Sequence, residues 1–227
     1  MLPLSPDLVL NAYACGVFPM AERRDDDEVF WIDPEIRGVL PLDRFHMPKR
    51  LARTIRSGRF KISANCEFRA VITACAAPNE RRPESWINDP IIDVYCELHA
   101  RGHAHSVECW EDERLVGGLY GVSLGAAFFG ESMFSRARDA SKVALAHLVA
   151  RLRAGGFLLL DTQFVTPHLA SFGVEEVPRG TYLEWLRQAI AREADYCPPG
   201  YSPACGAPAV SPAASGVSAM HSSTQTS

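Results

Sequence analysis

The sequence predicts an α+β fold with a central mixed sheet flanked by helices, preceded by a small mixed lobe at the N-terminus. Three strand-like segments at 104–110, 115–122 and 126–134 are joined by short links, which indicates an antiparallel meander. A helix, an apolar strand and another helix follow, as in a βαβ unit. With 47% apolar and 22% charged residues, the chain of 227 residues has the composition of an ordinary globular protein, not of a collagen or a coiled coil.

The first elements are indicated by capping and turn residues. Ser5 and Pro6 predict the start of a short helix, and Gly16 is expected to end it because glycine adopts the left-handed conformation at low cost. Two short strands are expected at 29–32 and 38–40, on either side of an Asp-Pro turn.

Caps and apolar periodicity predict the elements of the larger part of the chain. Helices are expected to begin at Met47, Phe68, Asp89, Asp139, Thr166 and Tyr182. Besides the meander, strands are expected at 60–62, 157–160 and 174–177.

The C-terminal segment differs in composition from the rest. From Tyr196 to Ser227 the chain contains no Asp, Glu, Lys or Arg, and it is rich in Pro, Gly and Ser. Such a segment cannot bury enough apolar surface to offset the entropy lost on ordering. We therefore expect three units: a small N-terminal lobe over 1–36, a larger domain over 37–195 and a disordered tail over 196–227.

The formal net charge of −4 conceals an uneven distribution along the chain. Residues 1–36 carry two basic and eight acidic side chains, whereas residues 37–83 carry eleven basic and three acidic ones. Six of these basic residues recur along one helix and the strand after it: Lys49, Arg50, Arg53, Arg56, Arg59 and Lys61. We expect them to form a cationic surface that binds a polyanion, although a solvated helix face would show the same pattern.

Cysteine usage and hydropathy indicate a cytoplasmic protein that does not span a membrane. The seven Cys are odd in number and form no C-x-x-C pair, so neither a disulfide framework nor a zinc ribbon is predicted. The first 15 residues lack the basic segment that opens a secretory signal, and no long uncharged apolar run follows. His103 and His105 share a strand face, but no third residue has metal-ligand spacing, so we expect no metal.

Two places in the sequence put polar side chains where chemistry is favoured. Asp161 and Gln163 end an apolar strand, and alternation along the strand points both to one side. Glu131 is a carboxylate inside an otherwise apolar strand, where burial without a partner is costly or shifts its pKa. We expect function at all three, although Asp161 could instead cap the next loop and Gln163 could be a surface amide.

Several enzyme classes have no support in the sequence. No Ser or Cys stands in a nucleophile-elbow or other recognisable catalytic motif, so covalent catalysis is not indicated. Walker A and G-x-G-x-x-G motifs are absent, and residues 134–142 contain no loop that would cradle the pyrophosphate of acetyl-coenzyme A. An acyl donor other than coenzyme A is therefore expected, and no cofactor is predicted.

Five motifs occur in order: GHAHSVE at 102–108, LVGGLYG at 115–121, FGESMFSR at 129–136, ASK at 140–142 and DTQ at 161–163. With GVFP at 16–19 and Trp86-Ile87, they resemble the leucyl/phenylalanyl-tRNA-protein transferase family over about residues 5–190. The resemblance implies a small N-terminal domain on an acetyltransferase-like (GNAT-like) domain. It also implies a cytoplasmic enzyme, expected here as a monomer, that moves Leu or Phe, less efficiently Met, from aminoacyl-tRNA to proteins with N-terminal Arg or Lys. In the N-end rule pathway this transfer marks the proteins for degradation.

The resemblance assigns Asp161, Gln163 and Glu131 to the catalytic site. Gln163 is expected to accept a hydrogen bond from the attacking amine, since a neutral amide is too weak a base to take its proton. Asp161 would polarise that arrangement or take up the proton through water. Glu131 would face either the cationic acceptor or the terminal ribose, and the basic surface would hold tRNA phosphates.

The resemblance also predicts a pocket in which hydrophobic burial selects the amino-acid side chain. Its positions here are Leu119, Phe128, Met133, Leu145, Leu148 and Leu160. Trp86 is expected to stack on the terminal adenine, and Met20 to make a softer contact near the same nucleoside. The family pattern has an aromatic residue at the position of Leu148 and Trp at that of Met20.

Two other classes of function remain open from the sequence. A coenzyme A-dependent N-acetyltransferase would share the fold, but the absent pyrophosphate loop counts against it. A noncatalytic tRNA- or peptide-binding protein would need the basic helix, but it would not need an Asp-x-Gln strand end.

Overall fold

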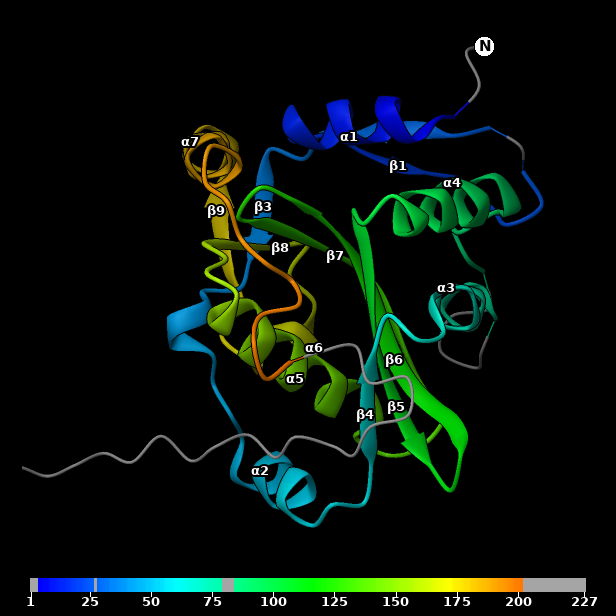
Figure 1. Cartoon of the computed structure of the whole chain (residues 1–227). Coiled ribbons are helices and arrows are strands. Elements are labelled where there is room, and N and C mark those ends of the chain that lie inside the picture. Colours follow the sequence, from blue (N-terminus) through cyan, green and yellow to red (C-terminus); the bar gives the residue numbers. More distant parts are fainter. Residues whose placement is uncertain (1–3, 27, 79–83, 202–227) are drawn as a thin grey trace, which may run out of the picture.

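The computed structural model describes residues 4–26, 28–78 and 84–201 and confirms the α+β class, with a mostly antiparallel sheet flanked by helices (Figure 1). The helices are α1 (Pro6–Ala14), α2 (Lys49–Arg56), α3 (Phe68–Ala76), α4 (Asp89–Ala100), α5 (Ala140–Ala154), α6 (Pro167–Ala170) and α7 (Arg179–Ile190), with a 3-10 turn at Leu42–Arg44. The strands are β1 (Phe18–Met20), β2 (Phe30–Ile32), β3 (Ile36–Val39), β4 (Lys61–Ala64), β5 (Ala104–Glu111), β6 (Arg114–Leu124), β7 (Ala127–Ser135), β8 (Leu159–Gln163) and β9 (Glu175–Pro178). Within these ranges no helix combines the length and apolar composition needed to cross a membrane.

Side-chain caps begin three helices, namely Ser5 for α1, Asn88 for α4 and Thr166 for α6, each accepting a backbone N–H three residues further on. The cap of α4 is thus Asn88, one residue before the predicted Asp89. Asp139 precedes α5 as expected but makes no capping hydrogen bond, and its carboxylate pairs instead with two basic side chains.

The seven-stranded sheet has the order β4-β5-β6-β7-β8-β3-β9, and its β5-β6-β7 meander is the predicted one. Every neighbouring pair is antiparallel except β7 and β8. That parallel pairing runs only from Ala127 opposite Leu159 to Phe129 opposite Asp161, whereas β7 stays paired with β6 as far as Ser135. The two parallel strands therefore separate beyond Phe129, which leaves an opening within the sheet.

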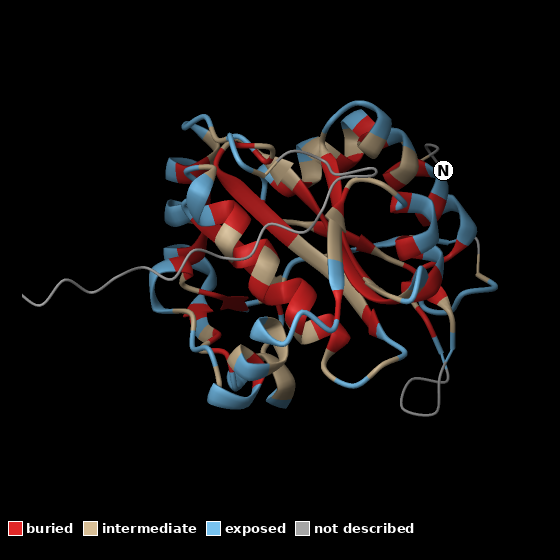
Figure 2. Ribbon diagram, turned by 60° about the horizontal axis from the view of Figure 1, so that its bottom comes forward, coloured by how far each residue is buried: buried red, intermediate tan, exposed pale blue. Residues whose placement is uncertain are grey.

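Helices cover both faces of this sheet (Figure 1). One apolar core lies between the sheet and helices α1, α3, α4 and α7. A second core lies on the opposite face, beneath α5, α2 and α6. The residues coloured as buried in Figure 2 concentrate along the central strands and on the helix sides that face them. The opening between β7 and β8 thus lies between two packed layers.

A β-bulge interrupts the pairing of β6 with β7. Tyr120 lies opposite Ser132 and Gly121 lies opposite Gly130, so Glu131 is an extra residue with no partner in the register. A bulge of this kind re-aims a side chain out of the regular alternation. Gly121 is required here, because a Cβ at this position would collide with the carbonyl oxygen of the neighbouring strand.

The N-terminal segment is built into the rest of the molecule. Strands β1 and β2 form a separate two-stranded sheet, but β3 inserts between β8 and β9 of the main sheet. Val9, Tyr13 and Phe18 pack in the same core as residues of α3, α4 and α7. The boundary predicted at residue 36 stays a prediction, and it coincides with the start of β3.

The start of the predicted disordered tail requires a correction. Tyr196 is only 4% exposed, and its ring stacks on His105 with centroids 3.9 Å apart. Its hydroxyl donates to the carbonyl of Ser106, and Arg151 donates to the carbonyls of Tyr196 and Tyr201. An uncharged segment can still pack when it carries one large aromatic ring and a buried cation satisfies its backbone. Residues 202–227 lie outside the described part of the chain.

Candidate active site

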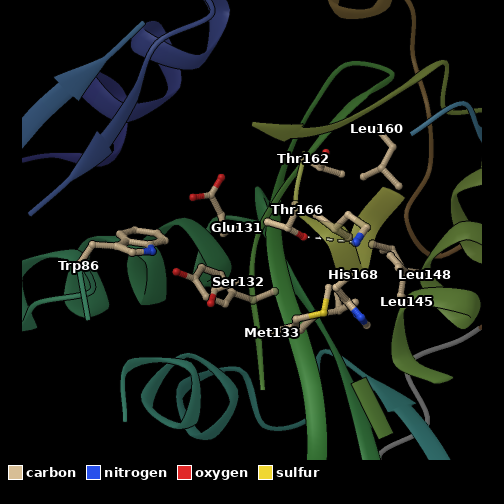
Figure 3. Close-up of a pocket in the computed structure, with 14 residues that line it drawn as sticks. Trp86, Glu131, Ser132, Met133, Leu145, Leu148, Leu160, Thr162, Thr166 and His168 are labelled. Carbon is tan, nitrogen blue, oxygen red and sulfur yellow. Dashed lines mark hydrogen bonds between the residues drawn. The ribbon is translucent and has the colours of Figure 1, made fainter. Parts of the chain in front are cut away.

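A cavity of about 300 Å³ opens where β7 and β8 separate, between β6, α5 and the segment around α6 (Figure 3). Its lining residues are Trp86, Leu119, Tyr120, Gly130, Glu131, Ser132, Met133, Leu145, Leu148, Leu160, Thr162, Thr166, His168 and Leu169. The position agrees with the general preference of open sheets for binding ligands at strand ends.

Six of the eight residues predicted to contact substrate line this cavity. Five of the six are aliphatic or thioether side chains from β6, β7, β8 and α5, and Trp86 is the sixth. In Figure 3, Glu131 and Ser132 lie between Trp86 and the group formed by Leu145, Leu148 and Leu160. The cavity therefore has an apolar end and an aromatic end, with a carboxylic acid between them.

The other two predicted contact residues do not line the cavity. Phe128 is fully buried and packs against the rings of Phe157 and Tyr196. Met20 ends β1 and packs on the core that lies between the sheet and helices α1, α3, α4 and α7. The next residue, Ala21, donates its N–H to the carbonyl of Trp86 at 3.2 Å, so Met20 is close in the fold to the Trp86 loop without entering the cavity.

Glu131 is held by neutral hydrogen-bond donors. Gln163 Nε2 donates to Glu131 Oε1 at 3.2 Å, and the Tyr95 hydroxyl donates to Oε2 at 3.4 Å. Tyr95 also shares a hydrogen bond with the buried hydroxyl of Tyr13. No Lys or Arg forms an ion pair with Glu131 among the described residues.

These surroundings change the protonation behaviour of Glu131. Burial raises its pKa to about 8; neighbouring hydroxyl groups partly oppose this change, and the charge of Asp161 adds to it. The carboxyl group can therefore gain or lose a proton near neutral pH. A cation placed in the cavity would favour the charged form, so Glu131 can respond to what the cavity contains.

Asp161 has the opposite environment. It is fully buried, and Arg37, 1% exposed, donates Nη2 to Asp161 Oδ2 at 2.8 Å and Nε to both carboxylate oxygens at 3.1 Å. The Tyr182 hydroxyl donates to Oδ2 at 2.7 Å. Burial would lower the pKa of Arg37, but the charge of Asp161 raises it above its ordinary value. Neither Asp161 nor Gln163 is among the residues that line the cavity, and the contacts of Asp161 favour a structural role over the predicted polarisation or proton uptake through water.

Asp161 instead fixes the backbone of Gln163. Its Oδ1 accepts the Gln163 N–H at 2.8 Å, and Gln163 has φ = 56°, a left-handed conformation that is uncommon for a residue other than glycine. The side chain of Gln163 then reaches Glu131. With Nε2 donating to Glu131, Oε1 is the acceptor of this amide, as assigned from the hydrogen-bond network.

Residues that sequence reasoning missed support both carboxyl groups. Arg37 and Tyr182 surround Asp161, Tyr13 and Tyr95 serve Glu131, and Arg37 also donates to the carbonyl of Gly16 at 2.8 Å. The only local signal was an Arg immediately before the strand expected at 38–40. Thr166, which predicted a helix start, proves to line the cavity together with residues of α6.

The six residues predicted to bind tRNA are all exposed on α2, β4 and the link between them. Two of them make ion pairs, Arg50 with Asp139 at 3.1 Å and Arg59 with Glu111 at 2.6 Å. Lys49, Arg53, Arg56 and Lys61 form no ion pair with a described residue. The predicted cationic surface is thus present, and its role in binding stays a prediction.

Metal binding has no candidate site in the part of the chain that the structure describes. No three side chains among its His, Cys, Asp and Glu residues are grouped so as to hold an ion. His105 is buried against Tyr196, and burial lowers its pKa to about 3.

Comparison with known proteins identifies the family. The family described as leucyl/phenylalanyl-tRNA protein transferase matches residues 39–187, and the N-terminal domain described for it matches residues 3–35. A leucyl/phenylalanyl-tRNA–protein transferase of Paramagnetospirillum magneticum is 60% identical over 194 residues, which cover 86% of this chain and 93% of the relative. The protein of that name from Phenylobacterium zucineum is 63% identical over 188 residues, which cover 83% and 85%.

A solved structure adds no weight to this comparison. The C-terminal domain of a putative lysylphosphatidylglycerol synthetase from Agrobacterium fabrum is 12% identical, with a TM-score of 0.38 over 74% of this chain and 55% of that chain, too low to support an argument. The sequence matches, in contrast, extend over nearly all of the structured residues and confirm the resemblance drawn from the motifs. The chain belongs to the leucyl/phenylalanyl-tRNA protein transferase family.

Proposed function

We propose that this protein transfers Leu or Phe, and less efficiently Met, from aminoacyl-tRNA to the α-amine of proteins that begin with Arg or Lys. In the N-end rule pathway this marks the acceptor for degradation. We further expect it to act as a monomer in the cytoplasm, without a cofactor. The observation that carries the proposal is the cavity itself, which joins an apolar end to a titratable carboxyl group.

The apolar end suits an uncharged amino-acid side chain. Leu119, Met133, Leu145, Leu148 and Leu160 offer no hydrogen-bonding group, so burial of apolar surface would select the side chain. A hydrophobic pocket discriminates weakly between similar side chains, which suits an enzyme that accepts both Leu and Phe. Leu148 leaves more room than the aromatic residue of the family pattern would.

The reaction requires alignment more than activation. The neutral α-amine attacks the ester carbonyl of the aminoacyl-tRNA, the C–N bond forms, and the bond to the terminal ribose oxygen breaks. The proton lost by the amine is finally gained by that ribose oxygen. An α-amine with a pKa near 8 is partly neutral at pH 7, so positioning it contributes most of the rate enhancement.

Each polar residue then has a distinct role. Gln163 accepts a hydrogen bond from the attacking amine through Oε1 and sets its direction. Glu131 faces the cationic side chain of the acceptor or the terminal ribose, and its charge state follows the arrival of the cation. Asp161 acts as a positioning residue, because it holds the backbone of Gln163 in its strained conformation, whereas the side chain of Gln163 reaches the cavity-lining Glu131.

The nucleoside and the tRNA body would bind outside the apolar end. Trp86 at the aromatic end offers a face on which the terminal adenine can stack. Met20 contributes through the loop that Ala21 fastens to Trp86. The exposed basic residues of α2 and β4 would neutralise phosphates without reading the base sequence.

One assay tests this proposal against the two alternative classes. The full chain is incubated with tRNA charged with labelled Leu, Phe, Val or Ile and with a peptide that begins with Arg, and separately with labelled acetyl-coenzyme A. We expect label from the Leu and Phe donors to enter the peptide, and much less from Val and Ile, whose Cβ branching fits the pocket poorly. Acetylation of the peptide would favour the N-acetyltransferase, and tRNA binding without transfer would favour the noncatalytic protein.

A further inference from the structure

A second cavity, of about 820 Å³, adjoins the amino-acid pocket. It lies at the start of α5 and is lined by four basic side chains, Arg50, Arg136, Arg138 and Lys142, and also by His168. His168 lines both cavities, so the two lie next to each other on either side of this residue. We call it the basic groove.

The charge of the basic groove is strongly positive. Among the described residues of its lining, Asp139 is the only acidic one, and its side chain is 11% exposed. Arg50 and Lys142 already engage its two carboxylate oxygens, at 3.1 and 3.3 Å. The positive charges of Arg136 and Arg138 are not offset by an ion pair with any described residue, so the groove has an excess of cations that a ligand could neutralise.

The cationic side chains, and not the helix terminus, supply this character. At the start of α5 the N–H groups of Ala140, Ser141 and Val143 already donate to Ala137, Ser135 and Asp139. Arg136 is held in place, with its guanidinium 5.3 Å from the centre of the Phe134 ring and Nη1 donating to the Leu115 carbonyl at 3.2 Å. A pre-positioned guanidinium loses little freedom when it binds a phosphate.

The basic groove also connects two regions that the proposed function needs to join. Arg50 belongs both to the groove and to the exposed basic face of α2, while His168 belongs to the groove and the amino-acid pocket. The cations of the groove thus lie between the surface of α2 and His168, at the edge of the cavity between β7 and β8. Their charge suits a single nucleic-acid strand followed along its backbone.

We propose that the basic groove binds the phosphodiester groups of the unpaired 3′ end of the tRNA, immediately before the terminal nucleoside. This inference rests on the proposed function and extends it by assigning a path for the acceptor strand. Arg136, Arg138 and Lys142 contact phosphate oxygens and read no base. The groove therefore contributes to affinity for every tRNA alike, and the amino-acid pocket alone discriminates among them.

Two aminoacyl donors, one with phosphates and one without, distinguish phosphate binding in the groove from an effect on the chemical step. One is phenylalanyl-tRNA, and the other is 3′-O-phenylalanyl-adenosine, which has the same ester and nucleoside but no phosphate. For Arg136→Gln/Arg138→Gln, we expect the ratio of kcat/KM with tRNA to kcat/KM with the adenosine ester to fall at least about tenfold. The salt dependence with tRNA should also weaken, by about 0.7 in logarithmic slope for each lost contact. Arg153→Gln/Arg192→Gln, a pair of exposed changes outside the groove that removes the same two charges, serves as the matched control.

A binding measurement keeps the groove testable even if no transfer occurs. Affinity for the trinucleotide cytidylyl-cytidylyl-adenosine is measured for the same three proteins, with coenzyme A as a competitor that also carries phosphates. We expect the double variant to lose most of its affinity and the control to lose none. Equal losses with both donors, an unchanged ratio of kcat/KM, or tighter binding of coenzyme A than of the trinucleotide would each overturn the proposal. Transfer from neither donor by the unaltered protein, with trinucleotide binding intact, would overturn the proposed function and leave the groove supported.

Discussion

Two carboxyl groups bracket Gln163, and their surroundings differ in one respect. Asp161 accepts its backbone N–H and is paired with the buried guanidinium of Arg37. Glu131 accepts its side-chain N–H and has only neutral partners besides. Asp161 therefore has a buried cation as its direct partner, whereas burial raises the pKa of Glu131 to about 8 and this group can change its charge. One carboxylate is thus suited to holding the structure and the other to responding to a ligand.

Among changes at these two carboxyl groups, removing the guanidinium of Arg37 should have the largest effect on stability. Arg37→Met leaves Asp161 buried without its counter-charge and cuts the bond to Gly16, so we expect a loss of about 3–5 kcal/mol in the free energy of unfolding. Urea denaturation measures this loss. Arg179→Met breaks the exposed ion pair with Asp33 and should cost far less, because water and salt screen exposed pairs. Similar losses in the two variants would mean that the buried pair has no special role.

Removing the amide of Gln163, which lies between the two carboxyl groups, should have the next largest effect, and this effect should be on the rate of transfer. Gln163→Ala removes the proposed acceptor of the amine hydrogen bond, and we expect transfer of Phe to an Arg-peptide to fall about 10²-fold. Binding of charged tRNA should change little, because no phosphate contact is lost. Gln188→Ala, which removes an exposed amide of α7, is the control. Transfer near the unaltered rate in Gln163→Ala would remove this residue from the mechanism.

The elements around this site were predictable from the sequence, but the partnership of Asp161 was not. The meander, α5 and the strand end at Asp161 follow from local periodicity and caps. Arg37 lies 124 residues away from Asp161 and reaches it because β3 inserts beside β8, a pairing that no local pattern specifies. Asp161 was predicted to polarise the amine arrangement or to take up the proton through water, and neither alternative anticipated its contact with Arg37.

The bulge in β7 is another feature that local sequence patterns do not specify, and it changes which side chains face the predicted pocket. Strict alternation would put Phe128 and Met133 on opposite faces, yet both pack in the core beneath α5, because Glu131 is an extra residue between them. Alternation alone could not have placed Glu131 in the cavity, although a carboxylate in an apolar strand did mark it for attention. The packing of Tyr196 was likewise hidden, since its partner His105 is distant in sequence.

The adjustable charge of Glu131 predicts a pH-dependent stability that Glu131→Gln should abolish. With a folded-state pKa of about 8 and an ordinary value of 4.5, the folded protein binds more protons than the unfolded chain between these limits. Stability contributed by Glu131 is therefore present below pH 4.5 and is lost as pH rises toward 8, by at most about 1.4 kcal/mol per pH unit. Urea midpoints at pH 5, 6.5 and 8 test this, with Glu176→Gln as an exposed control. Parallel pH profiles for Glu131→Gln and the unaltered protein would contradict the assignment.

The smallest expected effects come from removing one hydroxyl group at each carboxyl, and they test the comparison most directly. Tyr95→Phe and Tyr182→Phe each delete a donor, to Glu131 and Asp161 respectively, and each should cost on the order of 1 kcal/mol in the free energy of unfolding. The Tyr95 hydrogen bond lowers the pKa of Glu131, so its loss should raise that pKa and move the pH dependence of stability to higher pH. Tyr182→Phe should lower stability equally at pH 5, 6.5 and 8, because the Tyr182 hydroxyl contacts Asp161 and not Glu131. A pH-dependent loss in Tyr182→Phe like that in Tyr95→Phe would mean that the contrast between the two carboxyl groups does not hold.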